Sequence, residues 1–412
     1  MSPQELFAPT LEAARSRIAA VRPAEYARSR NALEGAVTRL SPYITHGFVS
    51  LPEVLAGVAA RHRLDAGHKF VFELGWREYF RHVWRHRGDR ILRSLHEGPL
   101  PEGAYAPELP ADIREARTGL AVVDQAVRAL YATGYLHNHA RMWLASYVVH
   151  LRKVHWRAGA DWMLGHLLDG DLASNHLSWQ WVAGTASHKP YLFNADNVAR
   201  HAPASWHSAG SVVDSSYEAL EAIARSPRPV PVRPLELGVE EPALSSRPPQ
   251  GSAPEAAEVA GRDVWLIHPW ALGEPPVGLP ADALRVAWWP DAHHEAWPWS
   301  AARWSFVGAR MSALATVAWR GSREQLGRAL ATARSVHTLA DEHVDAHLPA
   351  GVRRRPPLRL FPEVDRPCAS FSAWWNQVSR ESRCLSDLPG LRALAEQGPA
   401  GPLFVPGPGE RG

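Results

Sequence analysis

The stretch LLDGDLASNHLSWQW, residues 167–181, combines side chains that seldom occur together in ordinary core or ordinary surface. Its two carboxylates, one amide and two indoles are Asp169, Asp171, Asn175, Trp179 and Trp181. Carboxylates and an amide can hydrogen-bond the polar edge of a heteroaromatic ring, whereas indoles can stack on the ring or pass it an electron. The stretch therefore predicts a flavin pocket.

The composition predicts a folded, soluble and cytoplasmic protein. The chain has 412 residues, of which 46% are hydrophobic and 21% charged, which suits two or three globular domains. No apolar run approaches the roughly 20 residues of a membrane span, and the N-terminus lacks the apolar core of a signal peptide. Cys368 and Cys384 form no CxxC pair, so we expect no structural metal, and redox chemistry must come from a bound cofactor.

The charge leaves nucleic-acid binding open. A net charge of +3 and a pI near 9.0 are compatible with a DNA partner but do not require one. Nearly all of the basic residues are arginines. Arginine suits bidentate phosphate contacts, but a GC-rich genome produces the same bias without any function.

Apolar spacing divides the chain into two folded parts. Residues 1–224 show the three- and four-residue spacing of helices and predict an all-α domain. Residues 225–261 are rich in proline and small residues, which predicts an extended linker. Residues 262–385 alternate short apolar runs with helical stretches and predict a smaller Rossmann-like parallel α/β domain. We expect residues 386–412 to form a flexible tail.

Two segments near the N-terminus suit the binding of a phosphate. In TRLSPY, Thr38 and Ser41 precede a helical run whose free N–H groups could hold the phosphate, although plain helix caps have the same pattern. Tyr26 and Arg30 lie one helical turn apart and could add a ring and a charge to the same pyrophosphate.

Two further motifs place polar groups on one face of a helix. In ELGWREY, Glu73, Trp76 and Arg77 share a face; the alternative is a Glu73–Arg77 surface pair beside a core indole. In TGYLHNHARM, Asn138, Arg141 and Met142 share a face; the alternative is a satisfied polar core.

The ordered set TRLSPY, ELGWREY, TGYLHNHARM, HWRAGADWM and LLDGDLASNHLSWQW resembles the flavin-binding helical domain of the photolyase and cryptochrome family over roughly residues 20–205. The resemblance implies bound FAD. It assigns the cofactor contacts to Tyr26, Arg30, Thr38, Leu40, Ser41, Arg141, Asp169, Asp171 and Asn175. Asn175 stands where DNA-repairing members carry an asparagine facing flavin N5, which favours repair over signalling.

The same resemblance implies a cavity for a cyclobutane pyrimidine dimer flipped out of DNA. It assigns the substrate contacts to Glu73, Trp76, Asn138, Met142 and Trp181, and the catalytic roles to Glu73, Asn175, Trp179 and Trp156. The two catalytic indoles match the proximal and middle members of a photoreduction chain.

Two positions depart from the family pattern. His139 stands where the repair enzymes usually carry arginine. The distal position of the photoreduction chain falls near Gly103, which leaves three aromatic residues elsewhere as substitutes: Tyr105, Trp84 and Trp206.

The resemblance implies a light-dependent lyase that transfers an electron from excited, reduced FAD to a pyrimidine dimer in DNA, acting as a monomer without metal. The alternative is a cryptochrome-type blue-light photoreceptor without repair activity, and a flavoprotein that has lost DNA binding stays open. Residues 262–385 resemble the family's α/β antenna domain, which precedes the flavin domain in the family and follows it here. We assign no second chromophore.

Overall fold

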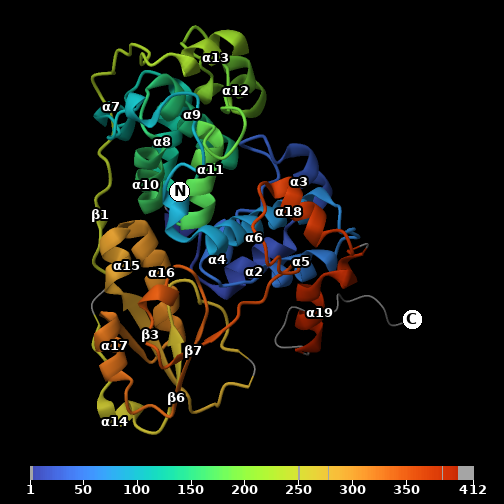
Figure 1. The fold of residues 1–412 in the computed structure, drawn as a ribbon, viewed down its shortest axis with the longest axis vertical. Coiled ribbons are helices and arrows are strands. Elements are labelled where there is room, and N and C mark those ends of the chain that lie inside the picture. Colours follow the sequence, from blue (N-terminus) through green and yellow to red (C-terminus); the bar gives the residue numbers. More distant parts are fainter. Residues whose placement is uncertain (1–2, 249–250, 277, 383, 398–412) are drawn as a thin grey trace.

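The computed structural model describes residues 3–248, 251–276, 278–382 and 384–397. Figure 1 shows an upper group of helices (α7–α13), a middle group (α2–α6 with α18 and α19) and a lower sheet flanked by α14–α17. The helices of the first part are α1 (Pro3–Leu6), α2 (Leu11–Ala19), α3 (Pro23–Ser29), α4 (Ser41–Thr45), α5 (Leu51–Ala59), α6 (Lys69–Arg87), α7 (Ala111–Arg114), α8 (Ala121–Thr133), α9 (Asn138–Ser146), α10 (Trp156–His166), α11 (Leu172–Ala183), α12 (Ala195–His201) and α13 (Tyr217–Arg225).

The later part of the chain alternates strands and helices. The strands are β1 (Leu244–Ser245), β2 (Asp263–Ile267), β3 (Leu284–Pro290), β4 (Trp299–Ser300), β5 (Val317–Gly321), β6 (Ser335–Leu339) and β7 (Val352–Arg355). The helices are α14 (Ala256–Val259), α15 (Asp291–Ala296), α16 (Ala301–Leu314), α17 (Arg323–Ala329), α18 (Phe371–Val378) and α19 (Pro389–Glu396). None of the helices in the described ranges is long and apolar enough to cross a membrane.

The predicted parallel sheet is confirmed. Within the described residues it has five strands in the order β5-β3-β2-β6-β7, and every neighbouring pair is parallel. Trp265 and Leu266 of β2 and Ala287 and Trp288 of β3 are buried, and because adjacent strand residues point to opposite faces, both faces of these inner strands are covered.

The described residues of segment 225–261 contain little regular structure, but they are held against the helices. The backbone N–H groups of Val230, Leu235 and Val239 donate to the carbonyls of residues 151, 117 and 115, respectively. Strand β1 of the same segment pairs antiparallel with β4. These residues therefore follow the surface of the helical part closely.

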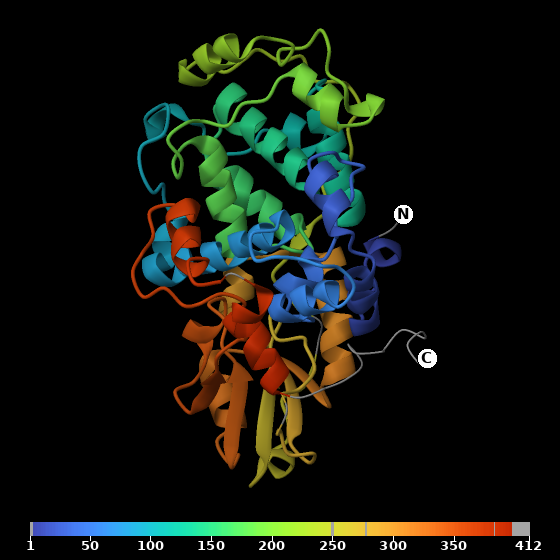
Figure 2. The same cartoon turned by 90° about the vertical axis from the view of Figure 1, so that its right-hand side faces the viewer.

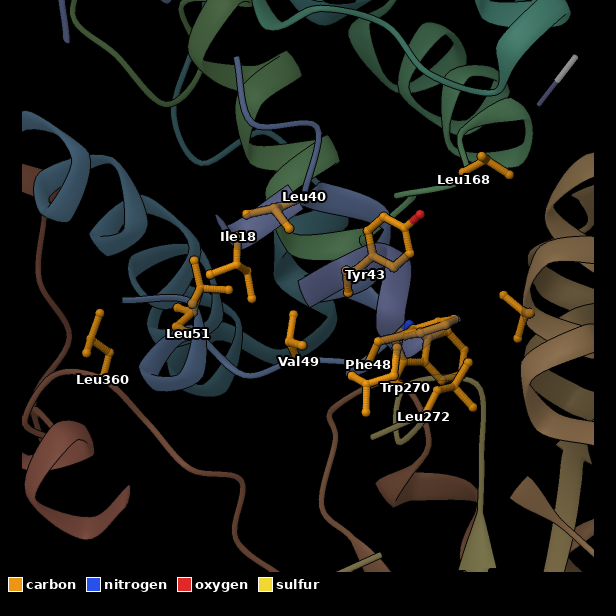
Figure 3. Packing of buried hydrophobic residues seen from close by; sticks show 14 of the residues in the cluster. Ile18, Leu40, Tyr43, Phe48, Val49, Leu51, Leu168, Trp270, Leu272 and Leu360 are labelled. Atoms are coloured by element: carbon orange, nitrogen blue, oxygen red, sulfur yellow. The ribbon is translucent and has the colours of Figure 1, made fainter. Parts of the chain in front are cut away.

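The helical part and the sheet share one apolar core. Phe48, which precedes α5, stacks on Phe306 of α16 with ring centroids 5.2 Å apart, and Tyr43 of α4 contacts the same ring. Figure 3 shows residues from both ends of the chain, among them Ile18 and Leu360, that belong to the same apolar cluster as Phe48. The N-terminal helices and the sheet therefore form one continuous body.

Two expectations about the C-terminal part are wrong. Helix α18 lies within the predicted α/β domain, but it packs on α6 of the helical part. Residues 386–397 do not form a tail, because α19 packs on α5, where a Cβ on Gly390 would lie 2.7 Å from the Pro52 ring. The rest of the predicted tail, residues 398–412, lies outside the described residues.

Replacing Gly75 with leucine should loosen α18 from α6. A Cβ at Gly75 would lie 2.8 Å from the Trp375 ring and 3.4 Å from the Trp374 ring, so the helices can approach only where no side chain intervenes. We expect a loss of about 1–3 kcal/mol of stability, as for other overpacked sites. Gly103→Leu is the control, since a Cβ there meets nothing within 4 Å. Amide hydrogen exchange should rise in residues 371–378 in the first variant alone; equal exchange in both would contradict this packing.

Candidate functional site

A cavity of about 620 Å³ lies between α3, α6, α9, α11 and the segment before α4. This volume falls within the range of about 300–1,000 Å³ that is usual for ligand sites. It is lined by all but two of the residues predicted from the sequence: Tyr26, Arg30, Thr38, Leu40, Ser41, Glu73, Trp76, Asn138, Arg141, Met142, Asp169, Asn175, Trp179 and Trp181. Asp171 and Trp156 lie outside its wall.

Helix α11 presents the central residues of this wall because its ends are fixed locally. The Asp171 carboxylate caps the helix by accepting the Ser174 N–H. Gly184 ends it in the left-handed region with φ 78°, which only glycine adopts without strain. The ring of Trp179 is packed tightly against α10, where a Cβ on Gly159 would lie 2.3 Å from it. The wall is therefore rigid.

The Asp169–Arg141 ion pair lies in the cavity wall. Arg141 Nη2 donates to both carboxylate oxygens at 2.9 and 2.8 Å, while its Nε holds the Leu136 carbonyl. Burial alone would raise the pKa of Asp169, but the charge and hydrogen bonds of Arg141, together with the smaller effects of Ser41 and Arg77, hold this pKa below its usual value. The pair therefore offers an ionised carboxylate and a fixed guanidinium to a ligand.

Arg77 lines the cavity, although the sequence did not predict it as a site residue. It donates to Thr45 Oγ1 at 2.8 Å. Burial lowers the pKa of Arg77, and the nearby carboxylates of Asp171 and Asp169 oppose that effect. The surface pair Glu73–Arg77 is not formed, because Glu73 instead bridges Arg30 (3.3 Å) and Lys69 (2.7 Å).

Asp171 serves the framework around the cavity. Besides capping α11, its carboxylate receives Arg81 at 2.7 Å. Arg81 also pairs with Asp341 and Glu342, which follow β6. Burial would raise the pKa of Asp171, but Arg81 keeps it well below its usual range. The side chain therefore ties α11 to the sheet and does not lie at the cavity edge where the resemblance placed it.

The Asn175 amide has a fixed orientation at the cavity. Its Nδ2 donates to the Ala160 carbonyl at 2.8 Å. This bond uses one of the two N–H groups, so Oδ1 is available to a ligand as an acceptor, beside the second N–H group. Asn175 is buried and lines the cavity, so a neutral acceptor faces the interior of the site.

Two indoles and an amide lie toward the open side of the cavity. Trp76 is half-buried, and one face of its ring is covered by Phe371. Trp181 is 40% exposed and packs beside Tyr191. Asn138 is exposed, and its amide lies 3.4 Å from Met142 Sδ. Apolar surface and hydrogen-bonding groups therefore meet where a ligand could enter from solvent.

His139 does not supply the charge of an arginine. It lines the cavity, and its ring lies 5.5 Å from that of His201. Burial, followed by the nearby positive charges, lowers the pKa of His139 to about 4. The His139 side chain is therefore neutral at pH 7 and supplies no positive charge to the cavity.

The two predicted electron-transfer indoles are buried. Trp179 borders the cavity, and Trp156 lies behind it with Nε1 bound to Ser94 Oγ at 2.9 Å. Ring contacts lead outward from Trp156 to His155 at 5.6 Å and from there to Tyr105 at 6.4 Å. Of Tyr105, Trp84 and Trp206, the three substitutes for the distal position, only Tyr105 is linked to Trp156 by ring contacts among the described residues.

Histidine rings begin three helices around the cavity. His68, His137 and His155 each accept a backbone N–H through Nδ1 at the start of α6, α9 and α10. His137 also donates through Nε2 to the Arg30 carbonyl at 3.1 Å. The acceptor bond at Nδ1 requires the neutral ring, so protonation of Nδ1 removes the cap, whereas the bond from Nε2 persists in the charged ring.

Acid should destabilise the protein through His137. Burial lowers its pKa from 6.5 to about 4, so its contribution is fully present above pH 6.5 and is lost as the pH falls toward 4. The loss for this buried ring amounts to about 3 kcal/mol. His137→Asn keeps a capping group without a titrating ring and should flatten the decline in unfolding midpoint over this pH range. An unchanged pH profile in that variant would contradict the assignment.

Comparison with known proteins matches part of the chain to one family. Residues 70–207 match the family model for the FAD binding domain of DNA photolyase. Over 165 residues the chain is 37% identical to the deoxyribodipyrimidine photo-lyase of Streptomyces griseus, covering 40% of this chain and 36% of that protein. Over 173 residues it is 33% identical to a cryptochrome DASH of Gloeobacter violaceus, covering 39% and 34%.

Solved structures include a Synechocystis cryptochrome with 27% identity and a TM-score of 0.42, covering 46% of this chain and 43% of that one. The chain matches only about a third of the length of the two curated relatives, 36% and 34%. Among the described residues, no group of three or more histidine, cysteine or acidic side chains is placed to hold a metal ion.

Proposed function

We propose that this chain, whose residues 70–207 match the FAD binding domain of DNA photolyase, binds FAD in the cavity and repairs cyclobutane pyrimidine dimers in DNA under light. One observation carries the proposal: a single cavity joins a buried, charged wall to an open side with two indoles. The wall suits a flavin, and the open side suits a pyrimidine dimer turned out of a duplex.

The donor set of the cavity fits FAD. Arg30 and Arg39 supply guanidinium groups, and Thr38 and Ser41 supply hydroxyls, a set suited to a pyrophosphate. Arg39 has φ 50°, an uncommon conformation for a residue with a side chain, and such strain persists where a ligand site requires it. The same cavity contains the Asp169–Arg141 pair, which suits the polar edge of the flavin ring.

The protein's own residues would position the reaction. When bound and reduced, FAD supplies the electron that opens the cyclobutane ring on excitation and takes it back afterwards. Asn175 offers a neutral acceptor beside the flavin without adding a negative charge. Buried Trp179 and the packed α10–α11 contact keep water from that side. Trp179 and Trp156 would relay electrons inward to the flavin from a reductant in solution.

The open side of the cavity would recognise the lesion. Trp76 and Trp181 supply apolar surface to flank a non-planar dimer, with Met142 completing that surface. Glu73 and Asn138 supply an acceptor and an amide for the N–H and carbonyl edges of the two pyrimidines. These roles deepen the sequence prediction, because one cavity contains all five side chains.

The second candidate is a blue-light photoreceptor that binds FAD and does not repair DNA. The neutral His139 at the position where repair enzymes usually carry arginine favours this alternative. It predicts flavin photoreduction without any light-dependent change in a damaged oligonucleotide.

A repair assay tests the proposal directly. Purified protein with reduced FAD is mixed with single- and double-stranded oligonucleotides that contain one thymine dimer, and dimer splitting is followed in light and in the dark. We expect splitting only in light. Photoreduction or tight binding of damaged DNA without splitting would reject the lyase in favour of the photoreceptor, and equal binding of damaged and undamaged DNA would indicate a flavoprotein without this substrate.

A further inference from the structure

The C-terminal segment 359–378 lies along α6. Figure 2 shows its helix α18, in red-orange, beside the blue ribbon of α6, and Figure 1 shows the same neighbours from the other direction. Helix α6 therefore contributes to the cavity wall and also packs against a segment that is encoded almost 300 residues later.

One stripe of α6 holds the backbone of this segment. Glu78, His82 and His86 follow at spacings of four, so they share a face of the helix. Their partners are the N–H groups of Leu360 and Phe361 for the glutamate, the N–H group of Cys368 for His82 and the carbonyl of Val364 for His86. Glu78, a residue of the ELGWREY motif that does not line the cavity, therefore binds the backbone of the C-terminal segment.

The docked segment ends in a direct contact with the cavity wall. Phe371, the first residue of α18, stacks on Trp76 with ring centroids 4.0 Å apart and an interplanar angle of 7°. Phe371 is itself 4% exposed and also packs edge-on against Phe72, a second residue of the cavity wall. Gly75 makes this approach possible, because any side chain there would meet the rings of α18.

We propose that Phe371 is a positioning residue for lesion binding, an inference that rests on the proposed function. The Phe371 ring occupies one face of Trp76, so a substrate can use only the remaining face and edge of the indole. The stack also restricts rotation of the Trp76 side chain, since a turned indole would lose a parallel aromatic contact. The C-terminal segment thereby prepares the indole before the lesion arrives, which lowers the entropy cost of binding.

Replacing Phe371 with alanine tests this role. We expect KM for a dimer-containing oligonucleotide to rise about tenfold, with kcat and FAD affinity unchanged. Phe371→Tyr restores the stack and should restore KM. Val378→Ala is the matched control, because Val378 is a buried residue of the same helix, 1% exposed, at its opposite end. An unchanged KM in the Phe371→Ala variant, or an equal rise in the Val378→Ala variant, would overturn the proposal.

A second measurement separates this inference from the proposed function. Protein labelled with 5-fluorotryptophan gives one ¹⁹F resonance for each indole, and Trp76→Phe identifies the Trp76 line by its loss. That line should shift in Phe371→Ala and stay in place in Val378→Ala, whether or not the protein repairs DNA. If the Trp76 resonance shifts as expected while the wild-type protein splits no dimer, the proposed function is wrong and the contact between Phe371 and Trp76 is still supported. If the Trp76 resonance does not shift, Phe371 does not position Trp76.

Discussion

Replacing Arg141 with methionine should abolish FAD binding. The substitution leaves the Asp169 carboxylate, 4% exposed, without the guanidinium that binds both of its oxygens. Breaking a buried ion pair by removing one partner costs about 3–5 kcal/mol. Because this pair lies in the cavity wall, the same change also removes the cation that fixes the carboxylate for the ligand. We expect FAD affinity to fall about 100-fold or more, measured from the quenching of flavin fluorescence on binding.

A second ion pair in the chain supplies the control for that variant. Arg152 binds both oxygens of Asp112 at 2.7 and 3.0 Å, and both side chains are buried, but neither lines the cavity. Arg152→Met should therefore lower the unfolding midpoint to a similar degree while leaving FAD affinity intact. Equal loss of FAD in both variants would show that general destabilisation, and not the cavity wall, explains the effect.

The sequence predicted the cavity well because its residues lie on local helical faces. Glu73 and Trp76 are three residues apart, as are Asn138 and Arg141, so helix geometry alone brings each pair to one side. The Asp171 cap and Gly184 end α11 with local signals that the sequence also contains. Helix geometry therefore predicts which residues share a face. The resemblance predicts which of these faces line the same cavity.

The errors concern partners that lie far apart in the sequence. The resemblance placed Asp171 at the cavity edge, but its carboxylate binds Arg81, and that arginine is held in turn by Asp341 from beyond β6. Helical spacing suggested Arg77 as the partner of Glu73, whereas the structure pairs Glu73 with Lys69, one turn earlier, and with the distant Arg30 at the end of α3. The spacing of residues along one helix cannot predict contacts between different elements, because those contacts depend on how the elements pack.

The C-terminal helices were missed for a related reason. Their composition, with glycine and proline around residue 390, is typical of a loose end. Their stability comes from other elements: α19 packs on α5, and the backbone before α18 is held by Glu78. A segment of this kind has few partners within itself, so only the tertiary structure reveals that it is ordered.

Replacing Glu73 with alanine should strongly depress dimer repair and leave FAD bound. Its carboxylate lines the cavity between Arg30 and Lys69, which orient it without covering it, since the side chain is 27% exposed. Hydrogen bonds to a charged acceptor contribute about 1.5–3 kcal/mol, so kcat/KM should fall about 10- to 100-fold. Glu73→Gln retains one acceptor oxygen and should lose less activity than alanine.

The matched control for Glu73 is Glu25→Ala, which removes an acid from neighbouring α3. Glu25 pairs with Arg22 in solvent and does not line the cavity, so its loss changes the local charge equally without touching the substrate side. Repair should then be unaffected. The same three variants also separate the two candidate functions, because flavin photoreduction needs no lesion and should proceed at the wild-type rate in all of them. If Glu73→Ala repaired dimers as fast as the control, the lesion would have to bind without this carboxylate, and the assignment of the open side as a substrate cavity would be wrong.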